Sequence, residues 1–373
     1  MSQGFSLKDQ LFNAEKLAYL AGLFAVADAK FDAPGFQSRT MSRLLTLELK
    51  QRISWIAACL GHALPGPLPG IAPVLLAALP PPLDPARNDD DFGDFIFAPL
   101  GELVVQKGLE DHRDLSLDLL GEITQRFSME WAIRPFLNRW PDQTLARLRN
   151  WTTHHSTHVR RLVSEGTRPR LPWGQGVTLP LTAGLEFLDV LQGDATRYVT
   201  RSVANHLNDI TKKDPDLAMD HLESWATAAQ QQRGELDWMT RHALRGLVKA
   251  GNARALKMLG YDPDVAVQVQ LSLAPGPVRI GDFLAFDCIL LAPVKTPALV
   301  DYVVFFHRPG GKVSRKVFKL KQLVAPADQP VTLTKRHRMK GDATTFKLVP
   351  GPHRLDIQVN GVVRASGGFD LTG

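Results

Sequence analysis

The chain has 373 residues, 44% of them hydrophobic and 22% charged, which excludes a disordered chain and allows one or two folded domains. Only Cys59 and Cys288 are present, too few and too far apart for a zinc site or a disulfide framework, so we expect a reducing compartment. The formal net charge is +6, and residues 265–373 hold 15 Lys and Arg against 7 Asp and no Glu, so the excess positive charge favours a polyanion contact there.

The chain shows no sign of membrane insertion or secretion. No apolar run reaches membrane-spanning length, and the N-terminus carries Ser2, Gln3, Lys8 and Asp9 instead of a charged stretch followed by an apolar one. We therefore expect a soluble cytoplasmic protein that makes no membrane contact.

The first part of the chain is predicted to be helical. Apolar residues at three- and four-residue spacing predict amphipathic helices over 5–30 and 40–62. Between residues 64 and 85 a dense series of prolines leaves room for only one short helix, around 73–79.

An acidic surface loop is expected at residues 89–91, followed by an apolar anchor over 92–99. A further helix is predicted over 113–128. The next helix begins at Glu130 and is kinked or restarted at Pro135, because proline cannot donate a backbone hydrogen bond.

A repeat follows from about residue 141 to residue 260, with two amphipathic helices in each unit. Segments 158–165, 198–205 and 238–245 align at a spacing of 40 residues, and this alignment places three arginines in one phase: Arg161, Arg201 and Arg241. Such a period predicts HEAT-like repeats, which stack into a curved α-solenoid with a concave face suited to a long partner.

Local signals mark the ends of the repeat helices. Ser156 and Thr196 are predicted to cap the second helix of their units through their hydroxyl groups. Gly166 is expected to end the first of these helices, and the Asp214-Pro215 pair to separate two helices of the next unit.

The periodicity changes after Gly260. Residues 265–273 alternate with period two, and further apolar runs over 283–291 and 300–307 are separated by turn signals. About seven short strands without a helical pattern predict an immunoglobulin-like β-sandwich. The expected fold class is therefore mainly α, with an α-solenoid over 1–262 and a basic sandwich over 263–373.

Four segments carry a resemblance to a known family: 90–100, 129–136, 158–173 and 202–210. Together they resemble the HEAT-like-repeat DNA glycosylases of the AlkC/AlkD group, and the AlkC branch more closely. The resemblance covers most of residues 5–260, and its most specific block is Glu-Gly-Thr-Arg-Pro-Arg-Leu-Pro-Trp over 165–173.

The resemblance implies a monofunctional DNA glycosylase of base excision repair. Such an enzyme hydrolyses the N-glycosidic bond of cationic alkylated bases, such as 3-methyladenine and 3-methylcytosine, in double-stranded DNA, without flipping the base into a pocket. We also expect an enzyme without cofactor or metal, monomeric and located in the bacterial cytosol, at the nucleoid when bound to DNA. Some members of the branch carry a C-terminal immunoglobulin-like domain.

Carboxylates suit this chemistry. A base methylated at a ring nitrogen is cationic and a good leaving group, so the enzyme must stabilise a sugar cation and orient water. Glu130 and Glu165, expected on successive inner helices, match acidic positions of the AlkC-like family. Trp173 is expected to pack against the sugar or base and attract the cationic lesion. Asp209, next to Asn208, lies where the family places another acidic contact.

Several arginines are candidates for phosphate contacts. Arg160, Arg161 and Arg168 can each grip a phosphate with the guanidinium fork. Arg201 and Arg241 remain open between this role and a structural ladder of ion pairs joining adjacent repeats. Without the resemblance, Glu130 and Glu165 would be interpreted as solvated helix carboxylates and Trp173 as a core residue.

The C-terminal domain holds a second group of cations. A predicted hairpin carries Lys312, Arg315 and Lys316, and the next basic run, 335–340, includes Arg336 and Arg338. Contacts from such residues to phosphates raise affinity without reading sequence, although a solvated basic face is equally compatible with the pattern.

Two other patterns are weaker. His154 and His158 have the spacing of a helical metal-ligand pair, but no third ligand is evident. The glycines at 310–311 lack the spacing of a phosphate-binding loop. The alternative function is a non-catalytic HEAT scaffold that binds damaged DNA or a protein partner, and it should tolerate Gln at positions 130 and 165.

Overall fold

The computed structural model describes residues 6–85, 87, 91–172, 174–341 and 347–373. Its helices are α1 Leu7–Leu11, α2 Ala14–Ala27, α3 Ala33–Leu44, α4 Leu49–Ala63, α5 Leu68–Ala77, the short 3-10 helix η1 Phe95–Phe97, α6 Ala98–Gly108, α7 Arg113–Ile123, α8 Arg134–Arg139, α9 Pro141–Trp151, α10 Thr157–Gly166, α11 Leu185–Leu191, α12 Arg197–Ile210, α13 Pro215–Ala228, α14 Arg233–Ala250 and α15 Ala253–Met258. The strands are β1 Gln268–Leu273, β2 Val278–Arg279, β3 Phe283–Leu291, β4 Thr296–His307, β5 Val313–Ala325, β6 Val331–Arg338, β7 Gly351–Val359 and β8 Val362–Thr372.

The first helices differ from the predicted ones mainly at their ends. The predicted helix over 5–30 is divided between α1 and α2, because Asn13 caps α2 by accepting a hydrogen bond from the Lys16 N–H. The predicted helix over 40–62 is divided between the end of α3 and α4, and Glu48 and Gln51 form a capping box at the start of α4. Helix α5 is longer than predicted and contains Pro73.

Helix α6 was not predicted, because residues 92–99 were interpreted only as an apolar anchor. Pro99 lies in its first turn, where the missing N–H costs no hydrogen bond.

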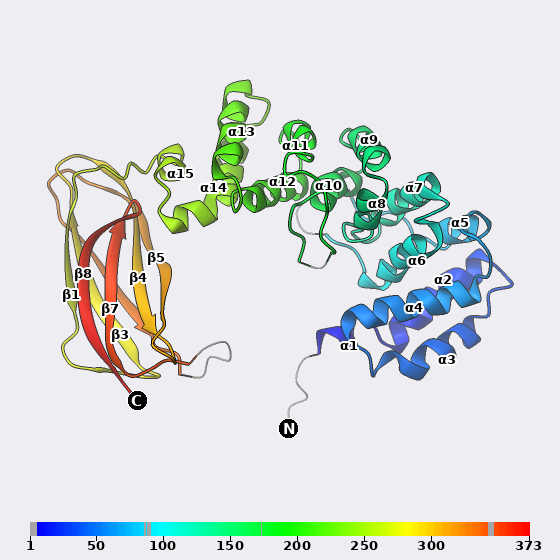
Figure 1. Ribbon diagram of the computed structural model, residues 1–373, viewed down its shortest axis with the longest axis horizontal. Coiled ribbons are helices and arrows are strands. Elements are labelled where there is room, and N and C mark those ends of the chain that lie inside the picture. Colours follow the sequence, from blue (N-terminus) through cyan, green and yellow to red (C-terminus); the bar gives the residue numbers. More distant parts are fainter. Residues whose placement is uncertain (1–5, 86, 88–90, 173, 342–346) are drawn as a thin grey trace. The chain divides into compact units, whose positions relative to one another are not determined.

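The helix pairs of the repeat are confirmed. Figure 1 shows α9, α11 and α13 in one layer and α10, α12 and α14 in the other, as expected for HEAT-like units. Helix α10 ends at Gly166 and the Asp214-Pro215 pair separates α12 from α13, both as predicted, and Asp214 also caps α13 through the Leu217 N–H. The predicted hydroxyl caps are wrong: Ser156 and Thr196 occupy the N-cap positions but their side chains accept no capping hydrogen bond.

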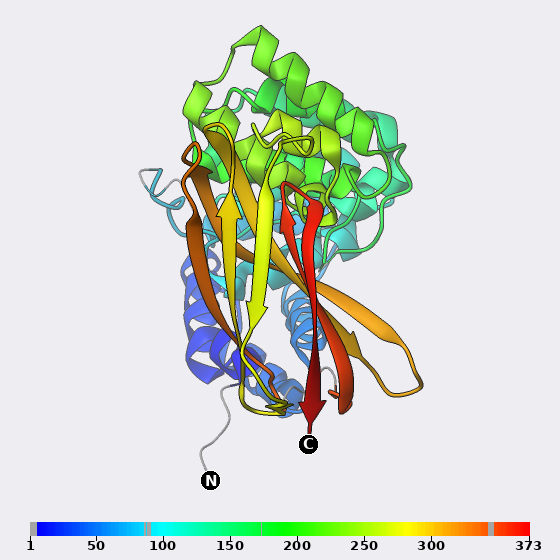
Figure 2. The same cartoon turned by 90° about the vertical axis from the view of Figure 1, so that its left-hand side faces the viewer.

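The C-terminal strands form the predicted sandwich. One sheet has the order β1-β3-β6 and the other β2-β8-β7-β4-β5, with apolar side chains of both packed between them. Among the described residues there are eight strands instead of about seven, because the two-residue strand β2 pairs in parallel with β8. The long β4–β5 hairpin, orange in Figure 2, extends beyond the neighbouring strands at its tip.

The chain divides into two compact units, Met1–Ala243 and Leu244–Gly373, with the division inside α14. Leu256 and Tyr261 pack on Leu299 of β4, so α15 belongs to the second unit. The predicted boundary between 262 and 263 remains a prediction. Within the described ranges, no single helix has the length and apolarity to cross a membrane, although α4 and α5, bent by 107°, pass the same test as a pair.

Candidate active site

Glu130 and Glu165 are brought together by a close approach between a turn and a helix. Glu165 lies near the end of α10, but Glu130 lies in the turn before α8, so the expectation that both are on inner helices is wrong for Glu130. The turn fits against α10 because Gly166 has no side chain. A Cβ there would lie 2.7 Å from Ile133 Cγ2.

The guanidinium of Arg161 lies between the two carboxylates. Its Nη1 is 3.7 Å from Glu130 Oε2, and its Nη2 is 3.9 Å from Glu165 Oε2. Nη1 also donates a 2.9 Å hydrogen bond to Ser128 Oγ. The rings of Phe92 and Tyr198, with centroids 5.1 and 4.7 Å from Cζ, flank the guanidinium. Arg161 is buried, so its first neighbours are the site's own residues.

Glu165 is fully partnered. Its Oε1 accepts a 2.5 Å hydrogen bond from Arg168 Nη1, and its Oε2 accepts a 2.6 Å hydrogen bond from Ser202 Oγ on α12. Burial opposes the charge of Glu165, but Arg161, Arg168 and Ser202 outweigh burial and hold the pKa of this carboxyl below its ordinary value. Glu165 is therefore a fixed negative charge at neutral pH.

Glu130 has the opposite character. Burial raises the pKa of Glu130 above its ordinary value, although Arg161 opposes the rise. Its Oε2 is buried and accepts no hydrogen bond from any residue that the structure describes. The side chain is 21% exposed, although Oε2 itself is buried. A raised pKa and an acceptor without a donor among the described residues are properties of a general base.

Asp209 lies on α12 behind Glu165. Its Oδ2 accepts hydrogen bonds from Arg168 Nε at 2.9 Å and forms an ion pair with Arg168 Nη2 at 2.8 Å, while its Oδ1 accepts from Lys212 Nζ at 2.8 Å. Asp209 thus holds Arg168 against Glu165. Its predicted contact with the lesion remains a prediction, and the adjacent Asn208 donates to the Ala243 carbonyl.

Arg134 is a residue that the sequence analysis missed. It is fully buried, and its guanidinium donates to the backbone carbonyls of Gly166, Arg168 and Gln175. Burial lowers the pKa of Arg134 to about 10. Arg134 therefore fixes the segment that follows α10, and with it the backbone of Arg168. The sequence did not indicate that Arg134 is buried, because an arginine at the start of a helix is ordinarily exposed.

The other arginines of the repeats have different surroundings. Arg160 pairs with Asp194 of the following repeat, with Nε 2.6 Å from Oδ2, which is the ladder arrangement. Arg201 is half-buried. Burial opposes the charge of Glu235, but Arg197 and Thr200, with a smaller effect from Arg201, hold the pKa of that carboxyl below its ordinary value. Arg241 is exposed. Their contacts with phosphate remain predictions, as does the role of Trp173, which lies outside the described residues.

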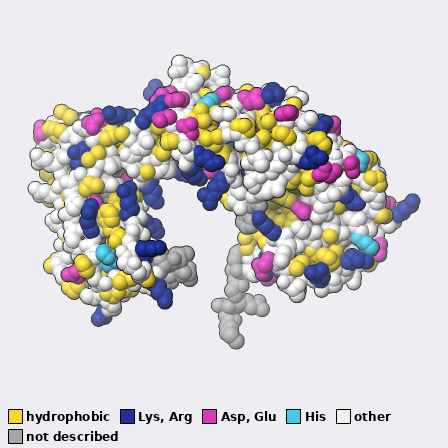
Figure 3. Space-filling view, viewed as in Figure 1, with side chains coloured by type: hydrophobic (Ala, Val, Ile, Leu, Met, Phe, Trp, Pro, Cys, Tyr) yellow, Lys and Arg dark blue, Asp and Glu magenta, His cyan; other side chains and the backbone are white. Residues whose placement is uncertain are grey.

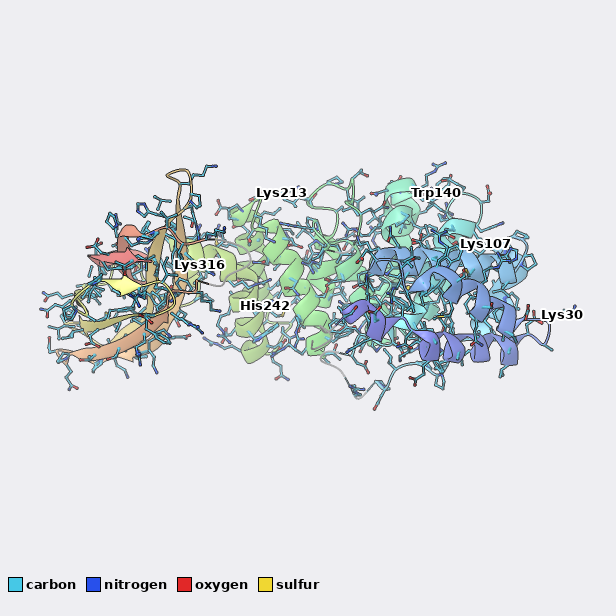
Figure 4. The ribbon with its side chains drawn as sticks, turned by 90° about the horizontal axis from the view of Figure 1, so that it is seen from below. Lys30, Lys107, Trp140, Lys213, His242 and Lys316 are labelled. Atoms are coloured by element: carbon cyan, nitrogen blue, oxygen red, sulfur yellow. The ribbon has the colours of Figure 1, made fainter. Side chains whose placement is uncertain are left out.

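The basic residues of the sandwich lie along two edge strands. Arg315 and Lys316 are exposed on β5, and Arg336 and Arg338 are exposed on β6, while Lys312 lies in the turn before β5. Figure 3 shows Lys and Arg side chains along the side of the sandwich where β5 lies, and Lys316 is labelled in Figure 4. Strands β5 and β6 are edge strands of the two sheets and contact each other, and we refer to their exposed cations as the basic band.

A cavity of about 430 Å³ opens beside Glu130. It is lined by residues of α4, of the segment around η1, of α6 and of the turn before α8: Leu49, Lys50, Ile53, Ser54, Phe92, Phe95, Glu102, Phe127, Ser128, Glu130 and Trp131. Glu130 therefore faces two environments, the charged cluster around Arg161 and an aromatic cavity.

The cluster can separate two tasks that a hydrolytic site requires. Glu165 can stabilise a developing positive charge because it is held ionised. Glu130 can accept a proton because burial raises its pKa and its Oε2 accepts no hydrogen bond from a described residue. Two carboxyl groups with pKa values shifted in opposite directions are a common sign of such a division.

Comparisons with known proteins show which proteins the chain is similar to. Residues 268–373 match a family model described as "Uncharacterised protein YhaZ, C-terminal Ig-like domain". The chain is 34% identical to the uncharacterized protein YhaZ of Bacillus subtilis (strain 168) over 274 residues, which are 72% of this chain and 75% of that protein.

A solved structure is also similar. It is the Pseudomonas fluorescens alkylpurine DNA glycosylase AlkC bound to DNA containing an abasic site analog, with 31% identity and a TM-score of 0.86. The match covers 99% of this chain and 100% of that one.

Proposed function

Since the chain belongs to the AlkC-type branch of the HEAT-like-repeat alkylpurine DNA glycosylase family, we propose that it is a DNA glycosylase acting on cationic alkylated bases in double-stranded DNA. The substrates are bases methylated at ring nitrogens, such as 3-methyladenine and 3-methylcytosine. The observation that carries the proposal is the pair of carboxyl groups of Glu130 and Glu165 on either side of Arg161.

The reaction requires little acid catalysis. When the bond between C1′ and the base nitrogen breaks, its electron pair moves to the base, so a cationic base leaves as a neutral molecule. The sugar then carries the positive charge. Glu165, ionised through Arg161, Arg168 and Ser202, stabilises this charge by electrostatics.

Water completes the hydrolysis. Glu130, whose Oε2 has no hydrogen-bond donor among the described residues, accepts the proton of the water that attacks C1′. The products are an abasic site and the free methylated base. Arg161 keeps both carboxylates in place and limits the repulsion between them.

DNA is held by the cations of both units. We propose that Arg241 and the basic band of β5 and β6 contact phosphates, because these side chains are exposed. Arg161 and Arg168 are occupied by Glu130, Glu165 and Asp209, so we assign them to the support of the site. Arg160 pairs with Asp194 in the ladder between repeats.

The test is direct. DNA methylated at purine and cytosine ring nitrogens is incubated with the protein, and released bases are separated by chromatography. We expect free 3-methyladenine and 3-methylcytosine and a matching number of abasic sites. Release no faster than in protein-free DNA would overturn the proposal.

A further inference from the structure

The aromatic cavity beside Glu130 has no role in the hydrolysis described above. Four rings line it, those of Phe92, Phe95, Phe127 and Trp131, and its volume of about 430 Å³ lies in the range of small-ligand sites. All of its lining residues belong to the unit Met1–Ala243. Flat rings that line a cavity favour a flat aromatic ligand.

The polar groups of the cavity specify the ligand further. Glu130 lines the cavity, and a carboxylate can accept a hydrogen bond from a ligand that carries an N–H or amino group. Lys50, Ser54, Glu102 and Ser128 add polar groups around the apolar walls. A planar heteroaromatic molecule with an amino group satisfies both requirements.

We propose that this cavity binds the methylated base after it has been released from the sugar. The inference rests on the proposed function, because the cavity adjoins the carboxyl group at which the bond would be cleaved. The base is cationic before cleavage and neutral afterwards. A neutral heteroaromatic enters apolar surroundings at a much lower desolvation cost than a charged one, so the walls favour the product over the attached lesion.

Binding of the free base tests the inference without DNA or turnover. Calorimetric titration with free 3-methyladenine is expected to show saturable binding to the full-length protein, and titration with cyclohexanol, which lacks an aromatic plane, is expected to show none. Ile53→Trp places a bulky ring in the cavity and should weaken base binding about tenfold or more.

A matched control lies on the same helix. Ala58 of α4 is exposed and is not among the residues that line the cavity, so Ala58→Trp should bind the free base as the wild type does. If Ile53→Trp fails to fold, Ile53→Ala serves instead. It removes part of an apolar wall and should weaken binding about threefold to tenfold.

Three results would overturn the inference. They are no binding of 3-methyladenine by the wild type, equal binding by wild type and both Ile53 variants, and an Ile53→Trp variant that loses affinity for lesion-containing duplex as strongly as for free base. The last result would mean that the cavity takes the base while it is still attached. Failure to release bases from methylated DNA would instead overturn the proposed function, so the two failures are distinguishable.

Discussion

Glu130 and Glu165 differ in their partners although each has an oxygen within 4 Å of the same guanidinium. Glu165 accepts hydrogen bonds from Arg168 and Ser202, whereas Glu130 Oε2 has no donor among the described residues. Hydrogen bonds to a carboxylate favour its charged form, and burial without them disfavours it. The two side chains are therefore suited to different steps, although they are chemically identical.

The raised pKa of Glu130 leads to a prediction on pH. A base must be deprotonated, so excision should increase as pH rises through the pKa of Glu130, and this acid limb should lie above about 4.3, the ordinary value for Glu. Single-turnover rates on a duplex with one 3-methyladenine, measured against pH, check this.

Arg161 provides the companion variant. It lowers the pKa of Glu130, so Arg161→Gln should move the acid limb to higher pH as well as reduce the rate. Arg149→Ala, which removes an exposed ion pair with Glu186, should leave the limb in place. An acid limb at or below the ordinary Glu value in the wild type would contradict the assignment of Glu130 as the base.

At the scale of elements, the site depends on the contact between the turn before α8 and the end of α10. Gly166→Ala places a Cβ 2.7 Å from the buried Ile133 Cγ2, so the turn that carries Glu130 must move. We expect a loss of about 1–3 kcal/mol in the free energy of unfolding and a lower excision rate. Urea denaturation and single-turnover assays measure the two effects.

Gly22 supplies the control for this substitution. It lies within α2, is exposed, and a Cβ there would meet no atom within 4 Å. Gly22→Ala should therefore stabilise the protein by about 0.5–1 kcal/mol and leave excision unchanged. Equal effects of the two substitutions would contradict the account of this contact.

The elements also show how much the sequence could predict. The forty-residue repeat and the period-two runs after Gly260 predicted both architectures, because each depends on spacing along the chain. Helix α6 was missed because residues 92–99 contain a loop and a helix start in one apolar run. Glu130 lies in a turn because α8 begins only at Arg134, with Pro135 in its first turn. The spacing of apolar residues in the sequence does not determine the residue at which a helix begins.

The residues of the site were predicted less completely than the fold. Glu130 and Glu165 were identified through the family resemblance, and the structure brings them together. Arg134, Ser128, Ser202 and Tyr198 were missed, because their contacts join residues 30 to 70 positions apart and no local pattern records them. Such contacts arise from stacking of successive repeats.

At the scale of the whole molecule, the excess positive charge lies in the C-terminal unit. Arg315, Lys316, Arg336 and Arg338 are exposed on the edge strands of the sandwich. Burial and the adjacent Lys335 and Lys316 lower the pKa of His337 to about 4, so this histidine adds no charge to the band at neutral pH. The band therefore owes its charge to lysines and arginines alone.

Salt dependence tests the band. Changing these four cations to Gln should weaken duplex binding regardless of sequence, and the slope of log K against log salt should become shallower by about 0.9 for each phosphate that the protein no longer neutralises. Fluorescence anisotropy at several salt concentrations measures this slope. An unchanged slope would show that the band is a solvated face.

The measurement closest to the central claim compares Glu130→Gln with the wild type in two assays, single-turnover excision of 3-methyladenine and affinity for a duplex with an abasic-site analogue. If Glu130 accepts the proton of water, the rate should fall about 100-fold or more while the affinity changes less than about threefold. A variant that excises the base at the wild-type rate, or one that loses rate only in proportion to its affinity, would contradict the catalytic role of Glu130.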